Sequence, residues 1–270
     1  MIIEESGYWE SVADEWKKTR QDRLWRRHSD AINESLLGRW LPQISVPRLL
    51  KTDTFDEAVG EGLTRFLEAR AHTVVGMDLS FKNVKSACDG EPSVHGACAD
   101  VRQLPFQTES FDVVVSNSTL DHFKTSGEIT VSLRELHRVL RTGGQLIITL
   151  DNLANPAIAA RNHLPFKLLN RLGLVPYFVG ATWGPWRLQH VLREVGFEVK
   201  DVTSVLHCPR ILTVFFAKLL CSCSKSLSQQ QFLRWLQKFE RMSNWPTRYL
   251  SGHFIAVRAE KGRVPEGSGL

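Results

Sequence analysis

Two segments in the first third of the chain carry residues suited to binding a ribose-containing ligand. Asp56, Gly60 and Gly62 lie between an apolar run and a helical pattern. A strand, a glycine-bearing turn and a helix let backbone N–H groups approach a ligand closely. Asp78 closes the next apolar run, roughly 20 residues later, where a carboxylate can accept both ribose hydroxyls. The alternative role for Asp78 is to cap the helix that starts after Ser80.

A second candidate for chemistry follows the fourth apolar run. The ordinary pKa of His122 is close to operating pH, which suits removal of a proton from a substrate. Asp121 is adjacent, but neighbours in sequence need not face each other. The alternative for His122 is a helix-start residue packed under a lid. Asp151 and Asn152 are a further candidate pair at a strand end, with turn formation as their alternative role.

The cysteines favour neither a disulfide framework nor a metal site. The chain has five of them, at 88, 98, 208, 221 and 223. They are few and scattered, and the spacing of Cys221 and Cys223 is not that of metal ligands. We predict reduced cysteines and no metal.

No run of eighteen apolar residues and no signal-peptide pattern is present, so the sequence predicts a cytoplasmic protein.

The formal net charge of +5 leaves several kinds of partner open. Basic residues gather near the N-terminus and between residues 161 and 241. They form either solvated helix faces or contacts with an anionic substrate or membrane surface. The group Arg26, Arg27 and His28 could hold a phosphate or carboxylate. Nucleic acid is not expected, because no recognition motif accompanies the charge.

Two segments, Phe166–Leu172 and Ile211–Leu220, contain many apolar residues together with basic ones. Either they are buried lid helices, or they touch a membrane surface or a lipid-like substrate.

The alternation of strand-like and helical runs predicts an α/β protein. We expect a Rossmann-like, mostly parallel seven-stranded sheet with helices on both faces, N-terminal helices and two helical insertions. The expected strands are 48–56, 73–78, 94–98, 111–116, 145–150, about 197–204 and 253–258. The expected helices lie within 8–40 and near 62–70, 80–88, 127–140 and 185–195, with a turn at Gly143-Gly144 after the third of these four.

The chain divides into a helical cap, a main domain and a tail. We predict the cap over 1–46, the domain over 47–258 with insertions at about 152–184 and 205–250, and a loose tail over 259–270. Each insertion follows the carboxyl end of a strand, where open α/β sheets bind ligands. The insertions and the cap therefore form either a lid or peripheral packing. Candidate aromatic contacts for a substrate are Trp9, Trp16, Trp25, Trp183 and Trp186.

Two more segments complete an ordered set. They are Ala97-Cys98-Ala99-Asp100-Val101-Arg102-Gln103-Leu104-Pro105-Phe106 and Phe111-Asp112-Val113-Val114-Val115-Ser116-Asn117, followed by the run from Leu133 to Leu146 that contains Arg141-Thr142-Gly143-Gly144. With the Asp56 and Asp78 segments, this set resembles the class I S-adenosylmethionine-dependent methyltransferases, in their small-molecule, type 11-like branch. The resemblance covers residues 48–204 and extends to the final strand.

The resemblance implies S-adenosylmethionine as cofactor and assigns roles to individual residues. Asp78 would bind the ribose hydroxyls, and Asp100 would accept from the adenine amino group beside Val101. Gly60 and Gly62 would line the methionine part of the cofactor. Ser116 and Asn117 would lie beneath the sulfonium. Asp56 and Leu79 complete the predicted cofactor contacts.

The first motif departs from the family pattern. The family has acid-x-Gly-x-Gly-x-Gly, whereas residues 56–62 place Ala58 at the first glycine. The preceding strand also contains Lys51 and Asp53, which are unusual in a buried central strand. Either they pair with each other, or they contact an acidic group of the ligand.

We therefore predict methyl transfer from S-adenosylmethionine to a small or lipid- or saccharide-linked metabolite, with oxygen favoured as the acceptor. The alternatives are a non-catalytic S-adenosylmethionine-binding or scaffold protein and a nicotinamide-dependent oxidoreductase. Asp121 and His122 are the predicted catalytic residues. Peripheral membrane contact and the oligomeric state stay open.

Overall fold

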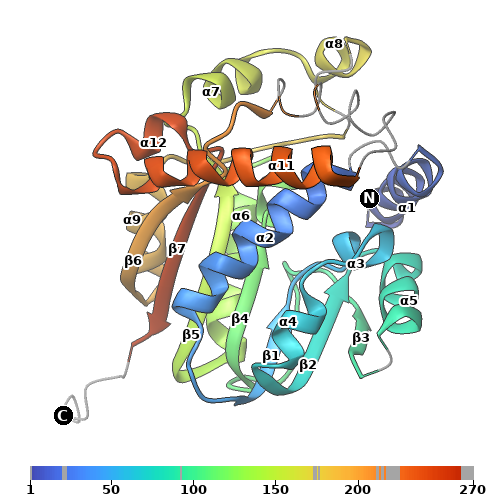
Figure 1. Ribbon diagram of the computed structural model, residues 1–270. Coiled ribbons are helices and arrows are strands. Elements are labelled where there is room, and N and C mark those ends of the chain that lie inside the picture. The colour runs from blue at the N-terminus through green and yellow to red at the C-terminus, as the bar shows by residue number, and fades with distance from the viewer. Residues whose placement is uncertain are drawn as a thin grey trace.

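A computed structural model describes residues 2–262, apart from 20–22, 92, 173–174, 176, 211–212, 214–215 and 217–225. Its centre is a seven-stranded sheet with the order β3-β2-β1-β4-β5-β7-β6 (Figure 1). Only the pairings of β7 with β5 and β6 are antiparallel. This confirms the predicted Rossmann-like α/β fold. The strands are β1 (Val46–Lys51), β2 (Ala71–Asp78), β3 (His95–Cys98), β4 (Phe111–Asn117), β5 (Leu140–Asp151), β6 (Phe197–Val205) and β7 (Phe254–Lys261).

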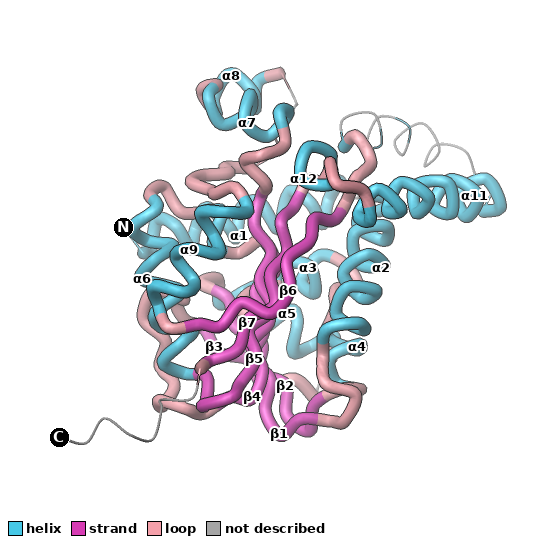
Figure 2. Tube along the Cα trace, turned by 90° about the vertical axis from the view of Figure 1, so that its left-hand side faces the viewer, coloured by secondary structure: helices cyan, strands magenta, loops and turns pink. Residues whose placement is uncertain are grey.

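Helices cover both faces of this sheet (Figure 2). Leu49 of β1 packs with α2 (Arg23–Trp40) and α4 (Thr64–Glu68). Leu50 points to the other face, where α6 (Ser126–Val139) and α9 (Pro185–Val195) pack. This alternation follows from the period of two in a strand and explains why the central strands are apolar on both sides.

The remaining helices lie around the carboxyl ends of the parallel strands. They include α1 (Ile2–Thr19), α3 (Phe55–Val59) and α5 (Phe81–Gly90). The first insertion contains α7 (Pro156–His163) and α8 (Phe166–Arg171). The second contains α11 (Ser226–Gln237), the 3-10 segment η2 (Lys238–Asn244) and α12 (Arg248–Ser251). Among the described residues, no helix is long and apolar enough to cross a membrane.

Several predicted boundaries are wrong. β1 ends at Lys51 rather than at 56, and α3 begins only four residues later. β7 continues to Lys261, so residues 259–261 belong to the sheet and not to a tail. β5 begins directly after α6, and Gly143-Gly144 lies within it, where the pairing with β4 shifts register. Residues 263–270, Cys221, Cys223 and most of the segment 211–220 lie outside the described residues.

Candidate active site

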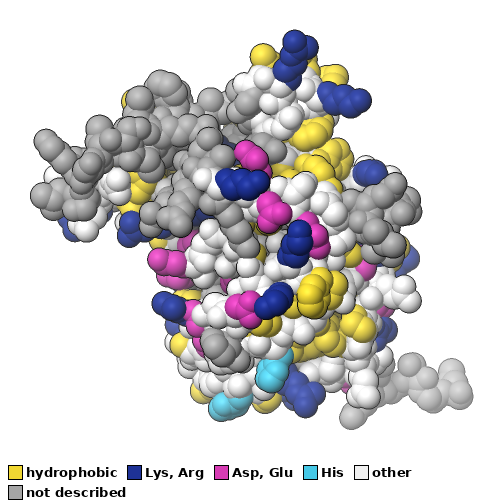
Figure 3. Space-filling view, turned by 90° about the vertical axis from the view of Figure 1, so that its right-hand side faces the viewer, with side chains coloured by type: hydrophobic (Ala, Val, Ile, Leu, Met, Phe, Trp, Pro, Cys, Tyr) yellow, Lys and Arg dark blue, Asp and Glu magenta, His cyan; other side chains and the backbone are white. Residues whose placement is uncertain are grey.

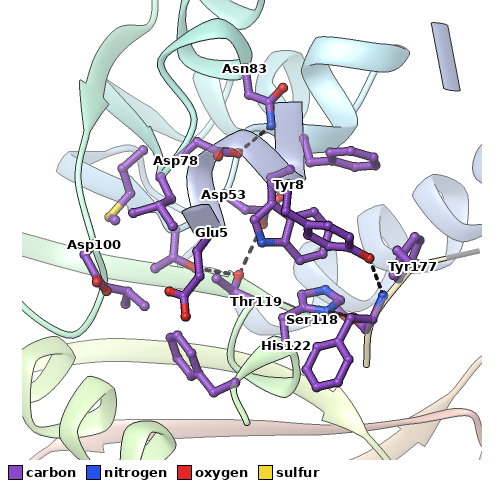
Figure 4. Close-up of a pocket in the computed structure, with 18 of the residues that line it drawn as sticks. Glu5, Tyr8, Asp53, Asp78, Asn83, Asp100, Ser118, Thr119, His122 and Tyr177 are labelled. Carbon is purple, nitrogen blue, oxygen red and sulfur yellow. Dashed lines mark hydrogen bonds between the residues drawn. The ribbon is translucent and has the colours of Figure 1, made fainter. Parts of the chain in front are cut away.

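A cavity of about 490 Å³ lies at the carboxyl ends of β1, β2 and β4, with α1 alongside (Figure 4). This size is ordinary for a small-molecule or cofactor site. Most of the residues predicted from the sequence line it: Asp56, Asp78, Leu79, Asp100, Val101, Asn117 and His122. Asp121, Gly60 and Gly62 are not among its described lining residues.

The predicted glycine turn is not the loop that enters the site. The chain leaves β1 through Thr52, Asp53 and Thr54, none of which is a glycine, and Asp56 lies within α3. Gly62 has a φ of +62°, and a Cβ there would lie 2.5 Å from the Glu57 side chain. Its lack of a side chain therefore makes room for Glu57 rather than for a ligand.

Lys51 explains how this loop is held without glycines. Its Nζ lies 2.9 Å from Glu57 Oε2 and 2.6 Å from the Asp53 carbonyl oxygen. Glu57 Oε1 in turn accepts from the backbone N–H of Leu63 and from Thr64 Oγ1. Burial would lower the pKa of Lys51, but Asp53 and Glu57 outweigh it and raise that pKa. Of the two alternatives for Lys51 and Asp53, the structure shows the pairing, at 3.4 Å.

Asp53 itself lines the cavity and was not predicted as a site residue. Burial is the largest cause that raises the pKa of its carboxyl, to about 7, although Lys51 opposes the shift. Thr119 Oγ1 donates to Asp53 Oδ2 at 3.3 Å. A carboxyl group that titrates near neutral pH in a cavity is suited to accept a proton. The sequence feature that could have identified Asp53 is its position directly after an apolar strand.

Asp78 faces the cavity from the end of β2, next to Asn83 (Figure 4). Its carboxylate accepts from the backbone N–H of Ser80 at 2.8 Å and of Thr54 at 3.2 Å. Burial raises its pKa against these hydrogen bonds. The helix-capping role belongs to Ser80, whose side chain accepts from the backbone N–H of Asn83. Asp78 is therefore not the cap of α5.

Asp100 is engaged by a neighbouring arginine. Arg102 Nε lies 2.9 and 3.0 Å from the two Asp100 carboxylate oxygens. The same guanidinium donates to Glu128 of α6 and to Glu5 of α1, each at 2.7 Å. Arg102 therefore ties α1 and α6 to the loop after β3. An adenine amino group at Asp100 would share that carboxylate with Arg102.

Asn117 ends β4 and lines the cavity with an unsatisfied side chain. Its Oδ1 and Nδ2 are buried, and neither has a hydrogen-bond partner among the described residues. Buried polar atoms are nearly always hydrogen-bonded, because an unpaired one costs about 1–3 kcal/mol. No described residue therefore accounts for this buried amide at the end of β4.

The predicted catalytic pair lies close together but faces different surroundings. Asp121 is completely buried, and its Oδ2 accepts from Ser118 Oγ at 2.9 Å and from the Asp151 N–H at 3.0 Å. Its Oδ1 lies 3.8 Å from His122 Nε2. Burial raises the pKa of Asp121. His122 lines the cavity, and its Nδ1 lies 3.0 Å from the Phe178 carbonyl oxygen, so Nδ1 carries a hydrogen.

Aromatic side chains of α1 form a wall of the cavity. The Trp9 ring lies 4.6 Å from the His122 ring and 5.9 Å from the Tyr177 ring, measured between centroids. Tyr8 Oη accepts from the Phe178 N–H at 2.7 Å. Of the five tryptophans considered, Trp9 is the one among the described lining residues.

The other basic and acidic candidates do not form the predicted sites. Arg26 lines the cavity and pairs with Asp56, Arg27 is exposed, and His28 is buried beside Cys208. These three residues therefore do not form one anion site. Asp151 is buried against Arg161 and His253 outside the cavity lining.

Asn152 forms a turn, because its Oδ1 accepts from the Ala154 N–H at 3.1 Å.

Comparisons with known proteins match part of this chain to methyltransferases. Residues 56–148 match the family model described as a methyltransferase domain. This stretch, about a third of the chain, is similar to that family. Among its relatives is malonyl-[acyl-carrier protein] O-methyltransferase of Salmonella typhimurium, 28% identical over 127 residues, 47% of this chain and 45% of that protein. Demethylmenaquinone methyltransferase of Streptomyces griseus is 31% identical over 130 residues, 47% of this chain and 49% of that protein.

Solved structures show the same fold at low sequence identity. The geranyl diphosphate C-methyltransferase from Streptomyces coelicolor has a TM-score of 0.55 at 11% identity, over 86% of this chain and 77% of that one. The [4+2]-cyclase SpnF has a TM-score of 0.57 at 18% identity, over 86% and 80%. The chain spans about half the length of the curated relatives it matches. Its family match begins at Asp56, so the loop held by Lys51 lies outside the matched stretch.

Proposed function

We propose that this protein transfers a methyl group from S-adenosylmethionine to an acceptor bound in the cavity beside α1. The observation that carries the proposal is the Asp78 carboxylate, which lines the cavity at the end of β2, with Asn117 lining the same cavity at the end of β4. Both groups lie within the stretch that matches the methyltransferase model.

The residues present fit the cofactor, with one departure. Asp78 would hold the ribose hydroxyls, and Leu79 and Val101 would supply an apolar surface for the adenine. Asp53 and Asp56 put carboxylates in the cavity, and carboxylates suit an ammonium group. Gly60 and Gly62 are no longer proposed as contacts, because α3 separates them from the loop after β1.

When bound, the cofactor supplies an electrophilic methyl group, and the chain's own residues position the acceptor and receive its proton. Positioning alone can contribute about 7–11 kcal/mol. For a hydroxyl acceptor, Asp53 is the proposed base, since its pKa of about 7 matches neutral pH. His122 is the second candidate. Asp121 Oδ1 lies 3.8 Å from its Nε2.

The wall of the cavity indicates the kind of acceptor. Trp9, Tyr177, Phe166 and Phe178 all line it. Aromatic faces favour flat or apolar molecules. Two of the relatives bear names that refer to a malonyl group on a carrier protein and to demethylmenaquinone. We therefore propose a small or lipid-linked acceptor with an apolar portion, methylated at oxygen.

A non-catalytic protein that binds S-adenosylmethionine is the second candidate, favoured by the loop after β1. Thr52, Asp53 and Phe55 line the cavity in and just after this loop, and none of them is a glycine. A loop in which every residue carries a side chain leaves less room for the methionine part of the cofactor than a glycine loop would.

Isothermal titration with S-adenosylmethionine and S-adenosylhomocysteine, with NAD for comparison, tests both candidates. We expect micromolar binding of the two sulfur ligands, lost in Asp78→Ala and kept in Asp89→Ala, which changes an exposed carboxylate on the nearby α5. Binding without turnover across a panel of hydroxyl, amine and carbon acceptors would favour the non-catalytic protein. If neither sulfur ligand binds, the proposal is wrong.

A further inference from the structure

The first insertion presents an apolar stripe to solvent. Leu164, Leu168 and Leu172 follow each other at intervals of four residues. Leu168 lies within α8, Leu164 precedes this helix and Leu172 is its C-cap. Their exposed fractions are 48%, 48% and 62%. The opposite side of α8 packs inward, with Leu169 buried and Phe166 lining the cavity. We call the exposed leucines the leucine stripe.

Basic residues run beside the leucine stripe with the same spacing. His163, Lys167 and Arg171 are all exposed. The sequence from 152 to 193 contains no Asp or Glu, but has five Lys or Arg. The second insertion repeats this bias, because residues 202–239 also lack Asp and Glu. The positive charge of the chain is therefore concentrated in the two insertions, and the rest is net acidic.

The shape of this region favours a soft, extended partner. α7 and α8 project beyond the sheet and its covering helices (Figures 1 and 2). The projecting tip shows apolar side chains next to Lys and Arg side chains (Figure 3). A convex tip of exposed leucines flanked by cations has the apolar and basic composition of segments that lie in the interface of a bilayer. A folded protein partner would more often meet a flat or hollowed surface with complementary pockets.

We propose that the leucine stripe docks this protein on an anionic phospholipid bilayer. The leucines enter the boundary between headgroups and acyl chains, while Lys167 and Arg171 contact phosphates. Phe166, on the inner side of the same helix, connects this surface to the cavity. The additional claim that the acceptor comes from the membrane rests on the proposed methyl transfer. The claim that the protein docks on the membrane does not depend on methyl transfer.

Co-sedimentation of the full chain with phosphatidylcholine vesicles, with and without phosphatidylglycerol, tests the docking. We expect binding only to the anionic vesicles, and weaker binding as salt is raised. Lys167→Gln with Arg171→Gln should lower the partition coefficient roughly 30-fold, since each cation near an anionic surface contributes about fivefold. Leu168→Ser with Leu172→Ser should lower it on the order of tenfold, because apolar surface no longer leaves water.

The matched control is Val131→Ser with Arg134→Gln, which removes one exposed apolar and one exposed basic side chain from α6. It should bind vesicles as the unchanged protein does. Circular dichroism checks that every variant is folded. The docking is wrong if the unchanged protein ignores anionic vesicles, or if the control loses as much binding as the stripe variants. Capture of an acidic carrier protein without vesicle binding would also overturn it.

Titration of the same variants with S-adenosylmethionine separates the two proposals. The leucine stripe lies outside the proposed cofactor contacts. Vesicle binding can therefore fail while cofactor binding persists, and cofactor binding can fail while vesicle binding persists.

Discussion

Lys51 and Glu57 form a buried ion pair, with Nζ 2.9 Å from Oε2 and side chains that are 2% and 3% exposed. Both residues lie beside the loop that leads from β1 into the cavity. Because removal of one partner leaves a buried charge without compensation, Lys51→Ala should lower the free energy of unfolding by about 3–5 kcal/mol. Chemical denaturation measures this.

Lys85→Ala is the matched control for that change. Its pair with Asp89 is more than 60% exposed on both sides, and exposed pairs contribute about 0–1 kcal/mol. Equal losses in the two variants would mean that the buried pair does not hold the loop.

Gly62→Ala should destabilise the protein more than Gly143→Ala. Both glycines have positive φ, +62° and +76°, so both substitutions carry a backbone cost of about 1–2 kcal/mol. Only at Gly62 would the new Cβ also meet Glu57, at 2.5 Å, while nothing lies within 4 Å of it at Gly143. The Glu57 carboxylate is held by Lys51 and cannot move away freely. Thermal unfolding of the two variants compares the costs, and equal costs would contradict the role given to Glu57.

The raised pKa of Asp53 predicts how stability changes with pH. Its value of about 7, against 3.8 for the ordinary carboxyl, means that the folded state binds the proton more tightly than the unfolded state. The stability contributed by Asp53 is therefore highest at low pH and falls as pH rises from about 4 to about 7. Asp53→Asn should reduce this fall, as measured by denaturation at a series of pH values.

Asp30 contributes in the same direction, because burial raises its pKa to about 8. Part of the decrease in stability with rising pH should therefore remain in Asp53→Asn. Asp89→Asn changes an exposed carboxylate and should leave the slope as it was. A slope that Asp53→Asn does not alter would exclude Asp53 as the group that titrates near neutral pH.

Asn117→Ala should separate stability from ligand binding. The change removes two buried polar atoms without partners, so the ligand-free protein should be as stable as before or more stable, by up to about 1–3 kcal/mol. Affinity for S-adenosylmethionine or the acceptor should fall tenfold or more. Calorimetry gives both quantities.

Asn152→Ala provides the contrast. Asn152 donates to the carbonyl oxygens of Tyr249 and Gly252, so its removal should destabilise the fold. If Asn117→Ala destabilises the protein equally and binds ligand normally, Asn117 has a structural role instead.

The order of elements could be read from the sequence. Strand-like runs with β-branched residues and helical runs with a period near 3.6 are local patterns, and they identified every strand of the observed sheet. Asp78 was predicted from its place at a strand end, and Asp100 and Asn117 from the resemblance to the methyltransferases. All three line the cavity. The entrance loop was misplaced because the glycines at 60 and 62 resembled the family turn, while the strand had already ended at Lys51.

Only the tertiary structure decided which of these groups face a ligand. Asp121 turns into the core, and Asp100 is engaged by Arg102, which also reaches Glu5, 97 residues away in sequence. Trp9 lies over His122 because α1 packs across the strand ends. Such contacts depend on how distant elements pack and how burial changes the charge of each group. Local periodicity specifies which element a residue belongs to, whereas the direction and pKa of its side chain are set by neighbours from other parts of the chain.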